Sequence, residues 1–335
     1  MSNPVRVAVD AMGGDNAPGE IVRGAAKAVQ ESPDVKCILV GQQEKIQALL
    51  APLDAPKDRI EVVDAREVIE TGEAPVMAIR SKKDSSLVKA MYMVKENKAD
   101  AFVSAGSTGA ILVGGQVIVG RIKGVDRAPL APMIPTEKGG ALLIDCGANV
   151  DARPTQLVQF AKIGSAYMES VMQMKNPRVA LVNIGAEEEK GNALVRETFP
   201  LLKNCPDINF TGNIEPRDIP AGEADVIVCE AFVGNVILKM YEGVASSLLR
   251  IVKNGMMSST RGKIGGALVK PALKEALADY DMNRYGGAPM LGLNGLVVKA
   301  HGSSNAETFK NAVLQCVAFG AMNVGEKIRG KLSTE

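Results

Sequence analysis

Several features that would mark whole classes of protein are missing from this sequence of 335 residues. No run of eighteen apolar residues occurs, and residues 1–4 lack the charged and apolar segments of a signal peptide, so we expect neither a membrane span nor secretion. The five cysteines are odd in number and form no CxxC pair, which argues against a disulfide framework and a zinc site. We therefore expect a cytoplasmic protein without a metal or cofactor.

The sequence also lacks what nucleic-acid-binding proteins need. It has no tryptophan, its aromatic residues amount to 4%, and its formal net charge is +1. Such a chain offers few rings for base stacking and no overall attraction for a polyanion. Nucleic acid is therefore not an expected partner, and a charged partner must be bound by a local patch.

Short apolar runs alternate with segments of helical periodicity along the chain. Continuous Val, Ile, Leu and Ala runs are typical of strands covered on both faces, and intervening helices predict a mostly parallel sheet. Strands are expected at residues 5–9, 36–40, 60–63, 101–104, 141–144, 178–182, 226–228 and 296–299. Helices are expected at 19–30, 44–50, 86–96, 111–119, 155–174, 193–202, 236–252 and 306–328. We expect a three-layer α/β/α protein, in one domain over residues 1–335.

The first expected strand ends in a tight turn, residues 10–18, that contains two adjacent glycines. Ligands of α/β proteins bind at the carboxyl ends of parallel strands, and free N–H groups at a helix start favour an anion. The alternative is a plain turn in which Asp15 or Asn16 caps the helix. The candidate ligand-binding residues of this turn are Asp10, Gly13, Gly14 and Asp15.

Small and hydroxyl-bearing residues follow the strand expected at 101–104. Their composition suits a phosphate cradle, although it matches neither the Walker A loop nor the GxGxxG turn. A helix cap beside a packed sheet is the alternative. The candidates are Ser104, Gly106, Ser107 and Thr108.

The strand expected at 141–144 is followed by a similar turn. Asp145 and Asn149 are candidates for backbone organisers or ligand contacts. Cys146, between them in the sequence, could be an acyl-enzyme nucleophile, but a buried structural thiol is the commoner use of cysteine. We favour the structural interpretation of Cys146.

Three later strand ends carry the candidate catalytic residues. Lys190 and Asn192 open a helix, where the lysine could bind an anion or could lie on a charged surface. Asn235 follows a Phe-Val-Gly segment, and His301, the sole histidine, follows the last strand. Since parallel strands end at the same edge of a sheet, these turns should converge on one phosphate-type crevice.

A basic segment between residues 243 and 275 interrupts this pattern. No acidic residue occurs from 243 to 274, and Gly255 is expected to separate two helices of a protruding hairpin. A membrane surface or an acidic protein is the expected partner, and a dimer interface or a solvated face is the alternative. The expected contact residues are Lys253, Met256, Met257, Arg261 and Lys263.

Together these turns resemble those of the acyl-acyl-carrier-protein:phosphate acyltransferases of bacterial phospholipid synthesis, over essentially the full length. The motifs are DAMGGD at residues 10–15, SAGSTG at 104–109, DCGAN at 145–149, EEKGN at 188–192, FVGN at 232–235 and HGS at 301–303. The resemblance implies transfer of a long-chain acyl group from acyl carrier protein to inorganic phosphate. It also implies a fold like that of isocitrate and isopropylmalate dehydrogenases and of phosphotransacetylases.

The resemblance further implies a homodimer at the cytoplasmic face of the membrane, whose acyl phosphate feeds a membrane glycerol-3-phosphate acyltransferase. Three alternatives stay open: a phosphotransacetylase acting on coenzyme A thioesters, a dehydrogenase of the related fold, and a non-catalytic module that binds lipid or carrier protein. The dehydrogenase would need metal-binding aspartates on one helix and a nucleotide loop, and the sequence offers neither.

Overall fold

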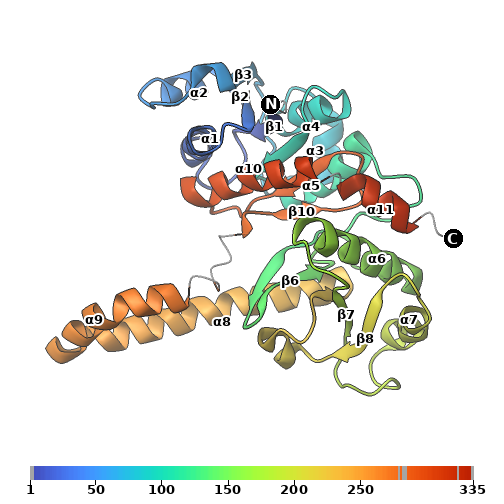
Figure 1. The fold of residues 1–335 in the computed structure, drawn as a ribbon. Coiled ribbons are helices and arrows are strands. Elements are labelled where there is room, and N and C mark those ends of the chain that lie inside the picture. The colour runs from blue at the N-terminus through green and yellow to red at the C-terminus, as the bar shows by residue number, and fades with distance from the viewer. Residues whose placement is uncertain (1–3, 278–279, 281–284, 323, 333–335) are drawn as a thin grey trace.

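In the computed structural model, which describes residues 4–277, 280, 285–322 and 324–332, the strands form two sheets (Figure 1). The first sheet has the order β10-β11-β4-β1-β2-β3, and only β10 is antiparallel to its neighbour. Its strands are β1 (Val5–Asp10), β2 (Val35–Gly41), β3 (Ile60–Asp64), β4 (Ala101–Ser104), β10 (Ala288–Met290) and β11 (Leu296–Lys299).

The second sheet has the order β5-β6-β9-β7-β8, again with one antiparallel edge strand, β5. Its strands are β5 (Met133–Thr136), β6 (Gly139–Ile144), β7 (Arg178–Val182), β8 (Asn209–Ile214) and β9 (Val226–Val228). The predicted α/β class and mostly parallel pairing are confirmed. The strands are nevertheless divided between two sheets where the sequence pattern predicts one, because alternating strands and helices look alike in both halves of the chain.

Helices cover both faces of the first sheet, as the alternation of buried side chains along β1 requires. Val7 and Val9 face α1 and α10, whereas Ala8 faces the opposite layer of α3, α4 and α5. The bounds are α1 (Gly19–Glu31), α2 (Gln43–Leu50), α3 (Pro75–Ser81), α4 (Ser86–Lys95), α5 (Thr108–Gly114) with a π-type turn at Gly115–Val119, and α10 (Ala306–Ala321).

The second sheet is layered in the same way. Leu142 and Ile144 pack towards α6, while Leu143 packs towards the start of α8. The bounds are α6 (Pro154–Val171), α7 (Ala193–Lys203), α8 (Ala231–Met257), α9 (Thr260–Ala276) and α11 (Val324–Leu332). Helix α11 packs on α6, and the Tyr167 and Phe319 rings lie 5.2 Å apart, so the end of the chain joins the two halves. The single helix expected at 306–328 is wrong, because α10 ends at Ala321 and α11 begins at Val324. Residue 323 lies outside the described residues.

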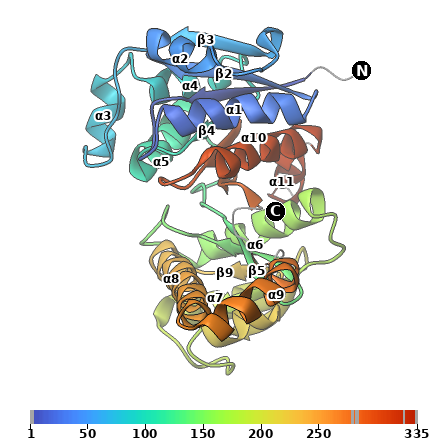
Figure 2. The same ribbon diagram turned by 90° about the vertical axis from the view of Figure 1, so that its left-hand side faces the viewer.

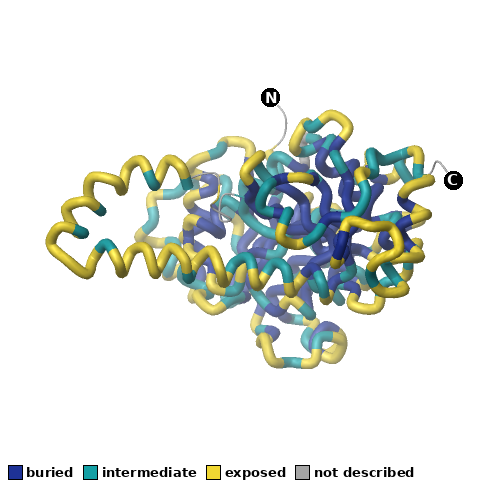
Figure 3. Tube along the Cα trace, turned by 90° about the horizontal axis from the view of Figure 1, so that it is seen from below, coloured by how far each residue is buried: buried dark blue, intermediate teal, exposed yellow. Residues whose placement is uncertain are grey.

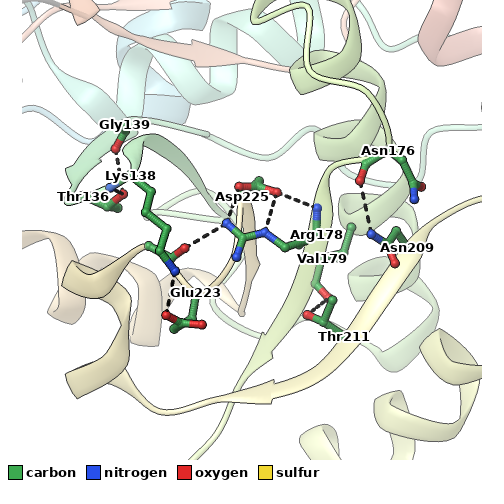
Figure 4. A network of polar contacts seen from close by, with 11 residues as sticks. Thr136, Lys138, Gly139, Asn176, Arg178, Val179, Asn209, Thr211, Glu223 and Asp225 are labelled. Carbon is green, nitrogen blue, oxygen red and sulfur yellow. Dashed lines mark hydrogen bonds and ion pairs between the residues drawn. The ribbon is translucent and has the colours of Figure 1, made fainter.

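A polar network holds the amino ends of β7 and β9 together (Figure 4). The Arg178 guanidinium donates to both carboxylate oxygens of Asp225, at 3.0 and 2.8 Å, and Lys138 pairs with Glu223 at 2.9 Å. Such a bidentate pair fixes geometry as well as charge. It sits at the end of this sheet opposite the turns that carry the candidate residues.

Helices α8 and α9 form the predicted hairpin, which projects from the body (Figure 1). Figure 2 shows the same hairpin from its tip. The predicted break at Gly255 is wrong: α8 continues through it to Met257, and Ser259 caps α9 by accepting from the Gly262 amide at 3.0 Å. A serine cap satisfies a free amide of the next helix, so the helix boundary falls at the serines. Most of the hairpin is exposed, in contrast to the buried body (Figure 3).

Candidate active site between the two sheets

The carboxyl ends of three neighbouring strands meet in the first sheet. Lys299 pairs with Ser104 in register, and the Ser104 hydroxyl donates to the Asp10 carboxylate at 2.7 Å. The Gly106 amide in turn donates to the Ser104 oxygen at 2.9 Å. Burial raises the pKa of Asp10, against the hydrogen bonds that it accepts. Asp10 and Ser104 are therefore hydrogen-bonded to each other, and Ser104 also holds the backbone of the turn after β4.

The glycines of the first turn allow a very close approach between these strand ends. A Cβ at Gly13 would lie 2.4 Å from the Asp10 carboxylate, and Gly14 has a φ of +114°. The amide of Asp15 donates to the Gly302 carbonyl at 2.9 Å. The turns after β1, β4 and β11, far apart in sequence, are thus in contact.

In the second sheet the turn after β6 is organised by one carboxylate. Asp145 is fully buried and accepts from the amides of Leu130, Ala148 and Asn149 at 3.0, 3.2 and 2.8 Å, and from the Asn149 side chain at 2.7 Å. Burial nevertheless raises its pKa to about 6. These contacts correspond to the organiser role; substrate binding by Asp145 and Asn149 stays a prediction.

Helix α8 begins directly against this turn. Its first turn is capped by Glu230, and a Cβ at Gly234 would lie only 1.9 Å from the Asp145 carbonyl oxygen. Only glycine permits this approach, which directs the next residue, Asn235, into the space between the sheets.

That space is a cavity of about 810 Å³, lined by the carboxyl ends of both sheets and one face of α8. Three of the predicted site residues line it: Thr108, Asn235 and His301. The Ser303 amide donates to His301 Nδ1 at 3.2 Å, which favours the proton on Nε2 in the neutral ring. The apolar lining of the cavity includes Leu130, Pro132, Met133, Leu238 and Leu249.

The other predicted residues are not among those that line this cavity. Lys190 is exposed on the loop after β7, and Asn192 caps α7 by accepting from the Val195 amide at 3.0 Å. Ser107 is buried and caps α5. A ligand role for these three residues stays a prediction.

Two lysines of the cavity were not singled out from the sequence. Lys299 is the last residue of β11, and Lys239 lies four positions after Asn235 on the same face of α8. Burial, followed by the charge of Lys239, lowers the pKa of Lys299 to about 8. The feature of the sequence that could have indicated Lys299 is a lysine at the end of an otherwise apolar strand.

The cysteines near the cavity are unsuited to nucleophilic attack. Cys146 and Cys229 are buried, and burial raises the pKa of both thiols well above its usual range. Because the thiolate is the nucleophile, such thiols are inert. No cluster of three or more metal-ligating side chains occurs in the part of the chain that the structure describes.

Solved structures share this architecture at low sequence identity. A phosphotransacetylase from Streptococcus pyogenes matches with a TM-score of 0.61 and 18% identity, over 94% of this chain and 93% of that one. A 4-hydroxythreonine-4-phosphate dehydrogenase from Klebsiella pneumoniae matches with a TM-score of 0.52 and 13% identity, over 95% and 100%. The protein is therefore a two-sheet α/β protein of the phosphotransacetylase fold, with a cavity at its strand ends.

The chain belongs to the fatty acid synthesis protein family, whose model matches residues 5–327. A curated relative from Clostridium novyi, named phosphate acyltransferase, is 49% identical over 328 residues, which are 98% of this chain and 98% of the relative. The predicted likeness to phosphotransacetylases is confirmed at the level of fold; that to isocitrate and isopropylmalate dehydrogenases stays a prediction.

Proposed function

We propose that this protein transfers a long-chain acyl group from acyl carrier protein to inorganic phosphate. The near-half identity to a named phosphate acyltransferase over almost the whole chain carries the proposal. The cavity supports it, because lysines and apolar side chains line the same space. A phosphate oxygen attacks the thioester carbonyl carbon, the carbon–sulfur bond breaks, and acyl phosphate and a thiol are formed.

Positioning supplies much of the rate in this account. Aligned reactants can save roughly 7–11 kcal/mol of barrier. Asn235 donates to the developing oxyanion, and His301 orients the reactants or gives a proton to the leaving thiolate. Lys190, on the loop after β7, neutralises charge on phosphate or on the developing oxyanion, and Asn192 donates a hydrogen bond. The turns at Gly13, Gly14, Ser104, Gly106, Ser107 and Thr108 shape the phosphate or pantetheine site.

The proposal is tested by incubating the protein with phosphate and a long-chain acyl thioester, and trapping acyl phosphate with hydroxylamine. We expect phosphate-dependent product with acyl carrier protein as the carrier and much less with coenzyme A. Product with coenzyme A alone would identify a phosphotransacetylase. Binding of carrier protein without consumption of the thioester would leave only a binding module.

Direct attack by phosphate predicts that the buried thiols are dispensable. Cys146→Ala and Cys229→Ala should each retain turnover within about threefold of wild type, because neither thiol forms a covalent intermediate in this route. Steady-state rates and circular dichroism on the same preparations check this. Loss of turnover in a folded variant would establish an acyl-enzyme and refute direct attack.

The hairpin suits a second part of the proposal, peripheral attachment to the inner face of the cell membrane. Met257 at the end of α8 is 55% exposed, and Lys253, Arg261 and Lys263 around it are exposed as well. Met256 instead packs on α9, where a Cβ at Gly266 would lie 3.3 Å from it. No helix among the described residues is long and apolar enough to span a bilayer. We further propose homodimer formation, and delivery of acyl phosphate to a membrane glycerol-3-phosphate acyltransferase.

Met257→Glu should therefore weaken binding to vesicles of anionic phospholipid about tenfold or more, because a carboxylate replaces an inserting apolar side chain. Co-sedimentation with the vesicles measures the effect. Met77→Glu, at an equally exposed methionine of α3, is the control and should bind like wild type. Equal binding by all three proteins would show that the tip of the hairpin does not contact the membrane.

A further inference from the structure

Two ammonium groups face the cavity from opposite sides. Lys299 ends β11 in the first sheet, and Lys239 lies on α8, which packs against the second sheet. Among the described residues of the lining, the charged side chains are Lys239, Glu242 and Lys299. The lining therefore carries one net positive charge.

The one acidic side chain among these three already forms an ion pair. Glu242 pairs with Lys239 at 2.8 Å. Lys299 donates to the Ala300 carbonyl, and no carboxylate of the described residues lies within ion-pair distance of it. A partly buried ammonium without an acidic partner is costly in free energy, unless an anion completes the site when it binds.

We propose that Lys299, together with Lys239, binds the phosphate that attacks the thioester. The assignment rests on the proposed function and deepens it. A tetrahedral dianion placed between the two ammonium groups neutralises both and accepts hydrogen bonds from them. Thr108 and His301, which also line the cavity, lie on the same side as Lys299 at the strand ends.

The rest of the cavity fits the second reactant. Leu130, Pro132 and Met133 line it from the segment that leads into β5, and Leu238 and Leu249 line it from α8. An acyl thioester held along these side chains would present its carbonyl carbon to a phosphate at the lysines. The charged side of the cavity therefore binds phosphate, and its apolar surface binds the acyl thioester.

The test measures binding of inorganic phosphate and of sulfate by calorimetry, at pH 7, to the full chain. Lys299→Met should weaken phosphate binding about tenfold to hundredfold, the usual effect of losing a hydrogen bond from a charged group. Lys239→Met, at an exposed position, should weaken it about tenfold. Lys45→Met, an exposed lysine of α2, should bind like wild type.

A stability measurement separates a binding lysine from a structural one. Without phosphate, Lys299→Met should unfold at a higher temperature than wild type, because it removes a partly buried charge that lacks an acidic partner. The assignment would be overturned if Lys299→Met unfolded at a lower temperature than wild type and Lys239→Met bound phosphate with unchanged affinity.

The dependence on pH provides a second readout. Sulfate keeps its charge between pH 7 and 9, whereas Lys299 loses its proton near pH 8, so sulfate affinity should fall over this range. The fall should be absent in Lys299→Met. Among the described residues, the other titratable groups around Lys299 are Lys239 and Glu242 of α8, Asp15 after β1, Cys146 after β6, and Tyr285 and His301 beside β10 and β11.

The assignment and the proposed function can fail separately. Acyl phosphate formation with an unchanged KM for phosphate in Lys299→Met would refute the lysine site and leave the function intact. If phosphate binding depends on Lys299 but no thioester yields acyl phosphate, the proposed function is refuted and the phosphate site stands. Absence of phosphate and sulfate binding by wild type would refute the lysine site.

Discussion

Replacement of Gly234 by alanine is expected to abolish activity and to lower the free energy of unfolding by about 3 kcal/mol or more, the upper range for overpacking a buried site. The new Cβ would lie 1.9 Å from the Asp145 carbonyl oxygen and 3.0 Å from the Cys229 sulfur. Both neighbours are held by a sheet, so the start of α8 must move instead. Asn235, the next residue, moves with it and leaves its position in the cavity.

The same helix provides a matched control for this substitution. A Cβ at Gly255 would meet nothing within 4 Å, and Gly255 lies inside α8. Gly255→Ala should therefore stabilise the protein by about 0.5–1 kcal/mol, the usual gain from replacing an exposed helical glycine. Urea denaturation and the acyl phosphate assay measure both variants. Wild-type activity in Gly234→Ala would show that the contact with Asp145 does not position the site.

Asp145→Ala should lower the free energy of unfolding by about 2–4 kcal/mol at pH 7, since each buried amide left without an acceptor costs about 1–3 kcal/mol and loss of a buried charge offsets part of this. The affected amides are those of Leu130, Ala148 and Asn149. Asp151→Ala, at an exposed position of the same loop, is the control and should change stability by less than about 0.5 kcal/mol.

The effect of Asp145→Ala should depend on pH in a definite direction. Burial gives the carboxyl group a pKa of about 6 in the folded protein, against 3.8 for an ordinary aspartate. Between these values the folded state holds a proton that the unfolded state has lost, so wild-type stability from this group falls as pH rises from 4 to 6. The difference between wild type and variant should therefore be larger at pH 4 than at pH 8, by about 2–3 kcal/mol. A difference that shrinks towards acid pH would show that Asp145 is ionised in the folded state throughout.

The strands that sequence reasoning identified are those with continuous apolar cores. β5 and β10 were missed, and both contain a proline, at Pro135 and Pro289. Proline argues against a strand in the middle of a sheet, but both of these are antiparallel edge strands, where it is tolerated. β8 was missed because Gly212, with a φ of +106°, breaks its apolar alternation beside a register shift in the pairing.

The site was predictable as a set of turns but not as a set of contacts. The rule that parallel strands end at one edge correctly brings the turns of Gly13, Ser104 and His301 together. It does not tell which side chains in those turns serve the backbone. Ser104 and Asp145 are polar residues at strand ends, yet their oxygens are occupied by neighbouring groups in the fold. Asn235, expected in a turn after a strand, lies inside α8 instead.

The position of Lys299 in the cavity could not be predicted from the sequence for a related reason. It ends an apolar strand, where a lysine is ordinarily a solvated boundary residue, and nothing in the local pattern shows that a helix more than forty residues earlier in the chain closes over it. The cavity and the second cation come from α8, a contact that only the folded chain creates.

The central claim is that phosphate binds in the cavity between the two sheets. Crystals soaked in tungstate, a tetrahedral dianion that scatters anomalously, test it most directly. The account predicts one dominant anomalous peak in this cavity, within hydrogen-bonding distance of the Lys299 ammonium group. A peak only at the exposed loop of Lys190, or anywhere else outside the cavity, would contradict it.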